Sequence, residues 1–181
     1  LEDYSCVPGM GCNSTATVTD SSITGIAGVL IDSGGEVTLS NTEVYGKDGD
    51  DPNFAQIFGT AVVLRGGNLS ALEGSSLVGD QHCAILSFQN DSLGGDADYL
   101  TASLRLDNSH LEGLAGSAIV VGNSYQIDYP EYFPTGDATI VVANDSTVVG
   151  GNGVLLDVQY GNNAHLIVDD SRLSGDIQAT E

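Results

Sequence analysis

The sequence predicts an all-β protein, a right-handed parallel β-helix (β-solenoid) of about six coils with inserted loops. Long helix formers such as Lys, Glu and Met are scarce, and no window carries apolar residues at helical spacing. The 24 glycines are spread along the chain among many Asn, Asp, Ser and Thr residues, which form turns and line strand faces. One short motif also recurs six times in the same order.

The recurring motif reads apolar, any residue, Asn or Asp, Ser or Thr, any residue, apolar, any residue, Gly. Its alternating apolar residues predict a strand with one buried face. The Asn/Asp–Ser/Thr pair predicts a corner, because these side chains bond to nearby backbone and tolerate left-handed geometry. Gly at the end permits the following turn. The copies are 18–25, 39–46, 72–79 (with Gly74 at the Asn/Asp position), 106–113, 143–150 and 168–175.

A short apolar run follows each of the first five corners and predicts a second strand in every repeat. These runs are 29–31, 61–64, 84–86, 118–121 and 154–156. Stacking of the repeats is expected to place Val18, Leu39, Leu106 and Val168 in one interior column. The strands of a β-sandwich are not equivalent, so a sandwich would not need one motif in the same order six times. We therefore predict one domain, 1–181, with an entry segment 1–14, stacked coils over 15–181, and loop insertions at 47–58, 89–99 and 124–136.

The charge is strongly acidic, with 25 Asp and Glu against 4 Lys and Arg and a net charge of −21. Such a surface repels phosphate backbones and anionic lipid, which argues against nucleic-acid or membrane-surface partners. The charge favours either a solvated secreted surface or the binding of cations. No apolar stretch is long enough for membrane insertion, and no signal peptide precedes Leu1, so we expect a processed piece or a fragment.

The cysteines indicate an oxidising compartment. Cys6 and Cys12 bracket a short segment rich in Pro and Gly, whose closure would allow a disulfide. The alternative is half of a zinc site, but no second cysteine pair and no nearby His support it. Cys83 stands in an apolar run and is predicted to be a buried free thiol.

The repeats at 104–113 and 166–177 resemble the passenger domains of Gram-negative autotransporters, a type V secretion family, and are most similar to the pertactin-like and AIDA-like adhesins. The resemblance covers nearly the whole chain. It implies a surface-displayed or secreted bacterial virulence protein, exported through the periplasm and outer membrane. Such a protein acts as an adhesin or as a binder of host factors in immune evasion. A host protein or glycan is the implied partner, and self-association is possible. The Cys6–Cys12 pair is similar to the small disulfide loops of some passengers. The motif builds coils and says little about activity.

Catalysis finds little support in the sequence, and neither a catalytic residue nor a cofactor is predicted. Repetition at the corners already explains the recurring serines, and His82, His110 and His165 fall in or beside different repeats. A polysaccharide-active β-helix enzyme is the alternative. Such an enzyme would need two carboxyl groups roughly 5 to 9.5 Å apart on one face. The adjacent candidates are Asp50 with Asp51, Asp96 with Asp98, and Asp169 with Asp170.

Two acidic loops are weak calcium candidates. Asp48, Asp50 and Asp51 form one, and Asp96 with Asp98 forms the other. Neither loop has the EF-hand pattern, so solvated turns remain the simpler interpretation and no metal site is predicted.

The insertion around 125–134 is the leading candidate for partner binding. Tyr-rich segments supply contact area at low entropic cost, although the same rings can fold back and cover the flank of the coils. A second candidate is the segment 53–58, and the two would form one surface if both project from the same flank. A passive stalk is the competing function. The candidate residues are Tyr125, Asp128, Tyr129, Glu131, Tyr132, Phe133, Phe54 and Phe58.

Overall fold

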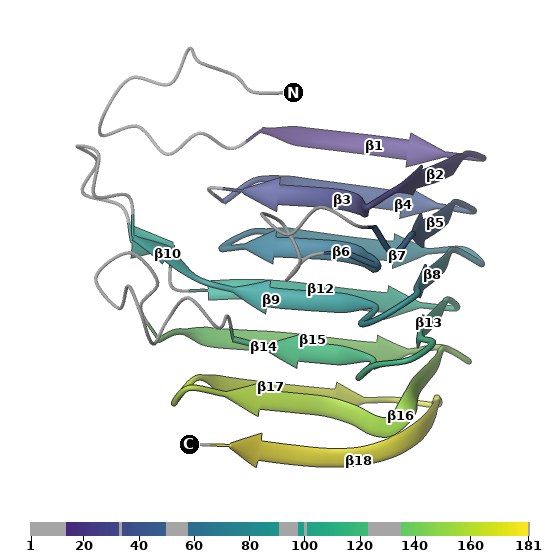
Figure 1. Ribbon diagram of the computed structural model, residues 1–181. Helices are drawn as coiled ribbons and strands as arrows, with labels where there is room; N and C mark the ends of the chain where they lie inside the picture. The colour runs from purple at the N-terminus through teal and green to yellow at the C-terminus, as the bar shows by residue number, and fades with distance from the viewer. Residues whose placement is uncertain are drawn as a thin grey trace.

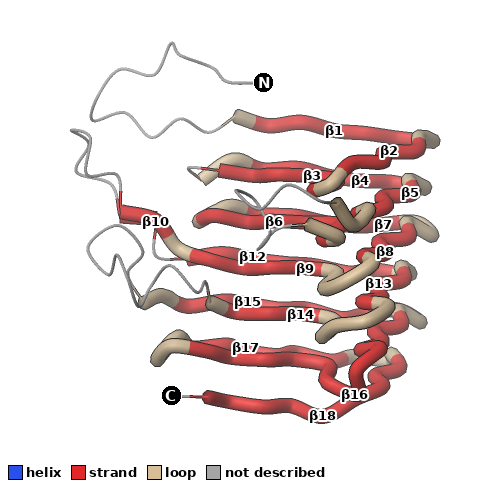
Figure 2. Tube along the Cα trace, in the orientation of Figure 1, coloured by secondary structure: helices blue, strands red, loops and turns tan. Residues whose placement is uncertain are grey.

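The structure, a computed structural model, describes residues 14–32, 34–49, 58–90, 98–99, 101–122 and 135–180 of the 181-residue chain. Every regular element in these ranges is a β-strand, as Figure 2 shows in red. The described ranges hold no helix that is long and apolar enough to cross a membrane. The fold is therefore all-β, in agreement with the sequence.

Six parallel strands form the first sheet and lie one above the other in Figure 1. Each pairs with the strand of the next repeat, so that the sheet grows by one strand per repeat. In sheet order the strands are β1 (Thr15–Thr19), β4 (Glu36–Ser40), β7 (Asn68–Leu72), β12 (Thr101–Asp107), β15 (Asp137–Ala143) and β17 (Asn163–Val168).

The second sheet is also parallel and has two arms that meet in the long strand β16 (Thr147–Gln159), which pairs with β18 (Arg172–Thr180). The corner arm holds the short strands that follow the predicted corners: β2 (Ser22–Gly25), β5 (Glu43–Gly46), β8 (Ser76–Gly79) and β13 (His110–Gly113). The apolar arm holds the predicted apolar runs: β3 (Ala27–Asp32), β6 (Thr60–Arg65), β9 (Ala84–Ser87) and β14 (Ile119–Val121).

The chain visits these ladders in a fixed order. A strand of the first sheet bends into the corner arm, continues into the apolar arm, and returns to the first sheet one strand further along. Parallel pairing between successive repeats requires such a crossover path. Neither sheet closes on itself: the first ends at β1 and β17, and in the second β2, β3 and β18 each pair with one strand only.

The parallel register places one side chain from each repeat in a column, as predicted. Val18, Leu39, Leu106 and Val168 do share a column, although Val168 is 43% exposed because β17 has a pairing partner on one side only. A second column of the first sheet runs Val37, Leu69, Leu104, Ile140 and Leu166, and the corner arm adds Ile23, Val44, Leu77, Leu111, Val148 and Leu173. Each fully buried Leu in these columns stabilises the stack by roughly 1.5–3 kcal/mol.

Two repeats depart from the predicted alignment. The motif places Leu72 and Ala143 at the apolar position, but the structure places Ala71 and Val142 opposite Leu106. The physical reason is a longer bend, with two residues of positive φ instead of one in each of these repeats.

The motif glycines are required for a different reason from the one expected. Only Gly175 among the six has a positive φ (129°). A Cβ on Gly79 would lie 2.0 Å from the carbonyl oxygen of His82, and one on Gly150 would lie 1.8 Å from that of Val154. The backbone that enters the apolar arm therefore lies in contact with the motif glycines, and it leaves no room for a side chain at these positions.

The middle strands of the apolar arm are buried on both faces. Val62 and Leu64 point into the core, and their neighbour Val63 on the opposite face is buried as well. The same holds for Ile85 and Val120, which continue the row of Val63, whereas Leu30 at the start of that row is 50% exposed. Burial of both faces explains why these runs are continuously apolar in the sequence instead of alternating.

Candidate functional site

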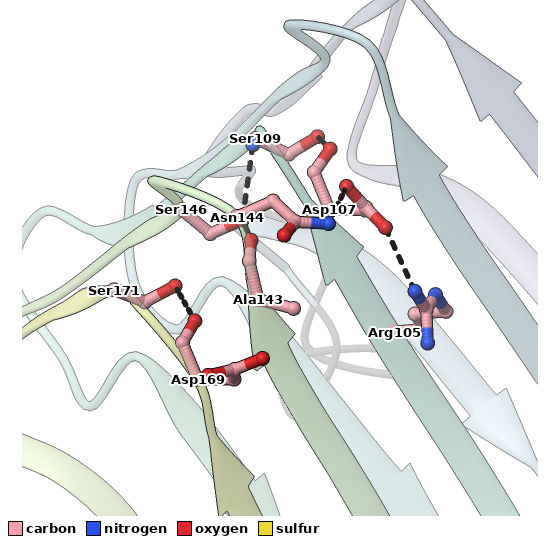
Figure 3. Close-up of polar contacts among 8 residues, drawn as sticks. All are labelled: Arg105, Asp107, Ser109, Ala143, Asn144, Ser146, Asp169 and Ser171. Atoms are coloured by element: carbon pink, nitrogen blue, oxygen red, sulfur yellow. Dashed lines mark hydrogen bonds and ion pairs between the residues drawn. The ribbon is translucent and has the colours of Figure 1, made fainter.

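The corners use the recurring polar residues to bend the backbone. The residue before each Ser or Thr has a positive φ in all six corners: Asp20, Asn41, Gly74, Asn108, Asp145 and Asp170. In every corner the following hydroxyl donates to the backbone carbonyl just before the bend: Ser21 to Thr19, Thr42 to Ser40, Ser75 to Leu72, Ser109 to Asp107, Ser146 to Ala143, and Ser171 to Asp169 (Figure 3 shows three of these corners). The prediction of left-handed corners is confirmed.

Neighbouring corners are also bonded to one another. The Oγ of Ser146 accepts the backbone N–H of Ser109 at 3.1 Å, as Figure 3 shows, and the Oγ of Ser75 accepts that of Thr42 at 3.2 Å. These hydroxyls already bond to backbone on both sides, so they are built into the structure. Their repetition has a structural explanation, as the sequence analysis supposed.

Asp107 joins two side chains at the surface of the corner stack. Its carboxylate accepts the Asn144 amide at 2.7 Å and the Arg105 guanidinium at 2.7 Å (Figure 3). The amide bond first, and then the bond to Arg105, hold the pKa of Asp107 below its ordinary value. A similar bond links the amide of Asn41 to Asp20 at 2.7 Å. Side-chain amides therefore connect the acidic groups of adjacent repeats.

A polar cluster lies at the base of the 47–58 insertion. Asp80 accepts the backbone N–H of Asp48 at 2.9 Å and the hydroxyl of Tyr45. These two bonds, the first larger, lower the pKa of Asp80, and the bond to Asp80 raises the pKa of Tyr45. Asp48 itself accepts the side chain of Gln81 at 3.1 Å and the N–H of Gly49 at 3.0 Å. The cluster ties the start of the insertion to the next repeat.

The calcium candidates are only partly described. The carboxylate of Asp48 is occupied by the hydrogen bonds to Gln81 and Gly49. Within the described ranges no group of three His, Cys, Asp or Glu residues is arranged to hold a metal ion. Asp50, Asp51 and Asp96 lie outside the described residues, and Asp98 is described only as backbone in the short strand β11 (Asp98–Tyr99), which pairs with β10 (Gln89–Asn90).

Of the candidate residues for partner binding, the structure describes only Phe58. Phe58 is 5% exposed, so its side chain packs inside the protein and does not offer a contact surface. Phe54 lies outside the described residues, as do Tyr125, Asp128, Tyr129, Glu131, Tyr132 and Phe133.

One side chain that the sequence analysis did not single out lies against both ends of the 124–136 insertion. Asn162 is 7% exposed; its Oδ1 accepts the N–H of Gly136 at 3.0 Å and its Nδ2 donates to the carbonyl of Gln159 at 2.6 Å. The same amide nitrogen would lie 3.1 Å from a Cβ on Gly122. Asn162 therefore lies against the residues that precede and follow the insertion.

The insertions leave the stack at two different ends. Segment 47–58 precedes the first residue of β6, whereas 89–99 and 124–136 follow the last residues of β9 and β14. Since β6, β9 and β14 are parallel neighbours, the last two insertions are anchored at the opposite end of the apolar arm from the first. The strand ends that anchor 124–136 and 89–99 thus lie side by side, apart from the strand end that anchors 47–58.

The histidines and Cys83 have individual environments. The Nδ1 of His82 accepts the N–H of Ser117 at 3.1 Å, and burial of the ring lowers the pKa of His82. His110 contacts Glu112 at 3.1 Å, and His165 is exposed on the first sheet. Cys83 is a buried free thiol, as predicted, and burial raises its pKa. Cys6 and Cys12 lie outside the described residues.

Comparison of the chain with protein-family models, with curated proteins and with solved structures yields no match. The functional interpretation therefore depends on the sequence and the geometry described above.

Proposed function

We propose that the chain is a right-handed parallel β-helix with one coil for each of the six strands of the first sheet. The support is the register: the ladder of the corner arm pairs the same motif position of successive repeats, including the glycine column from Gly25 to Gly150. The order of the strands, first sheet, corner arm, apolar arm, is that of a coil that advances by one strand spacing per turn.

On this scaffold we infer a binding function, that of a surface-displayed or secreted bacterial adhesin or host-factor binder of the autotransporter passenger type. The observation that carries the proposal is the use of the recurring polar side chains within the corners. Because the repeated polar residues form hydrogen bonds within the stack, we assign binding specificity to the parts that do not repeat, namely the insertions. A host protein or glycan is the proposed partner.

The experiment replaces residues 125–134 with a Gly/Ser linker of equal length and measures binding to immobilised host matrix proteins and to a glycan array. We expect the unaltered chain to bind and the linker variant to lose that binding while its β-sheet circular dichroism is unchanged. The matched control replaces 51–57 in the same way, because that insertion is anchored at the other end of the apolar arm. Equal binding by the unaltered chain and the 125–134 variant would refute the role of this insertion.

A passive stalk is the second candidate, and the regularity of the first sheet favours it. Five successive pairings run without a register shift from β1 to β17. A stalk would bind none of the host proteins or glycans, with or without the insertions, so the same experiment separates the two functions.

A further inference from the structure

Strand β16 contains a segment that pairs with neither neighbour. Its pairing with β13 ends at Gly150, and its pairing with β14 begins at Leu156. The register with β18 shifts between Val149 and Val154. Gly151, Asn152 and Gly153 fall in this gap and are exposed to solvent.

Asn152 is held there in an Asx turn. Its side-chain Oδ1 accepts the backbone N–H of Val154 at 2.9 Å, two residues further along the chain. This bond keeps the side-chain carbonyl carbon of Asn152 close to the intervening backbone nitrogen, that of Gly153. Gly153 has a φ of +84°, and a Cβ built on it would meet nothing within 4 Å, so the space beside its Cα is open.

At three other exposed asparagines, Asn41, Asn108 and Asn144, the N–H that follows is bonded across the stack. The N–H after Asn41 donates to the hydroxyl of Ser75, and the N–H after Asn108 donates to that of Ser146. The N–H after Asn144 donates to the carbonyl of Asp170 at 2.6 Å. Exposure is shared by all these asparagines, and Asn152 differs from the other three in its Asx turn and in its place between the paired parts of β16.

We propose that Asn152 is a site of spontaneous deamidation. The Gly153 nitrogen loses its proton to solvent base and attacks the Asn152 side-chain carbonyl carbon; a C–N bond forms, the bond to the side-chain nitrogen breaks, and ammonia leaves with a proton from water. Water then adds to one of the two carbonyls of the resulting cyclic imide and cleaves one C–N bond, which gives Asp or isoaspartate. No oxidant or reductant is required. Geometry that holds reacting atoms together is the main accelerating factor in such intramolecular steps.

The products alter the protein at a defined place. Both add one negative charge to a chain whose net charge is already −21. Isoaspartate also lengthens the main chain by one carbon between the two paired parts of β16, where the N–H of Asn152 approaches the carbonyl of Gly116 at 3.4 Å. The modification therefore changes the contact between this segment and the preceding repeat.

The test incubates the full chain at mildly acidic and mildly alkaline pH and quantifies deamidation at each Asn by peptide mass mapping. Asn152 is expected to react about tenfold or more faster than Asn108, at a rate that rises with pH, since a displacement of about 1 Å in a reacting pair is known to cost on the order of 100-fold. The variant Asn152→Gln should lose this reaction. A rate at Asn152 no higher than that at Asn108 would overturn the proposal.

A second arm repeats the incubation in urea and separates structure from local sequence, because Asn152 alone is followed by Gly. Unfolding frees the Ser109 nitrogen from Ser146, so the rate at Asn108 should rise about tenfold, whereas the loss of the Asx turn should lower the rate at Asn152. An equal effect of urea on both residues would show that the folded geometry plays no part.

Discussion

At the scale of single residues, the corner hydroxyls of Ser75 and Ser146 each serve two purposes. Ser146 donates to the carbonyl of Ala143 within its own corner and accepts the N–H of Ser109 from the preceding repeat. It is fully buried, so both partners would lack water if the hydroxyl were removed. The carbonyl of Ala143 also accepts the backbone N–H of Asn108 at 3.2 Å, so the group that loses its partner when the hydroxyl is removed is the N–H of Ser109.

The variant Ser146→Ala should therefore lower the free energy of unfolding by about 1–3 kcal/mol, the usual cost of leaving buried polar groups unsatisfied. Urea denaturation followed by circular dichroism measures the change. The matched control is Ser21→Ala, in which the exposed hydroxyl bonds only to the carbonyl of Thr19 and water can replace it. Equal effects of the two substitutions would show that the bond between corners contributes nothing.

Residue patterns predicted some of these features and not others. Asn or Asp before Ser or Thr carries a local preference for the left-handed region, so the corners were visible in the sequence. The longer bends were not, because Leu72 and Ala143 are themselves apolar and fit the alternating pattern one position too late. Asn162 could not be found either, since its contacts with Gly136 and Gln159 arise from the meeting of separate segments.

At the scale of elements, the glycine column decides how sharply each corner-arm strand turns into the apolar arm. The sequence identified these glycines by their recurrence, but recurrence does not distinguish a need for positive φ from a need for space. The structure shows a need for space at Gly79, where the obstacle is the backbone of His82. Gly74, which lies in a corner and not in this column, shows the other need: its φ is +82°, and its Cβ would meet nothing within 4 Å.

Alanine substitutions at these two glycines should consequently differ. Gly74→Ala should cost about 1–2 kcal/mol of stability, the penalty for a Cβ in the left-handed region. Gly79→Ala must displace main chain of the next segment, and it should cost more than the roughly 1–3 kcal/mol typical of overpacking by side chains. Thermal and urea unfolding of both variants measure this. A Gly79→Ala variant that is as stable as Gly74→Ala would disprove the close-approach argument.

At the scale of the whole molecule, stability is distributed along the stack because each repeat contacts mainly the repeats next to it. The middle strands of the apolar arm, β6, β9 and β14, are buried on both faces, whereas every residue of β18 is exposed to some degree. In such an array the stability of a repeat is set by its own packing and by its interfaces with its neighbours.

Amide hydrogen exchange should reveal this distribution. We expect protection to be highest in β6, β9, β12 and β14 and lowest in β1 and β18, which pair with a neighbour on one side only. The variant Leu104→Ala leaves a cavity at a fully buried position of β12. It should lower the free energy of exchange in the middle strands by about 2–5 kcal/mol. The control Leu173→Ala alters a partly exposed position in β18 and should leave β6 and β9 unchanged, since its effect must pass through the intervening repeats. If both variants lowered the protection of all strands equally, the molecule would unfold as a single unit and stability would not be a sum over neighbouring repeats.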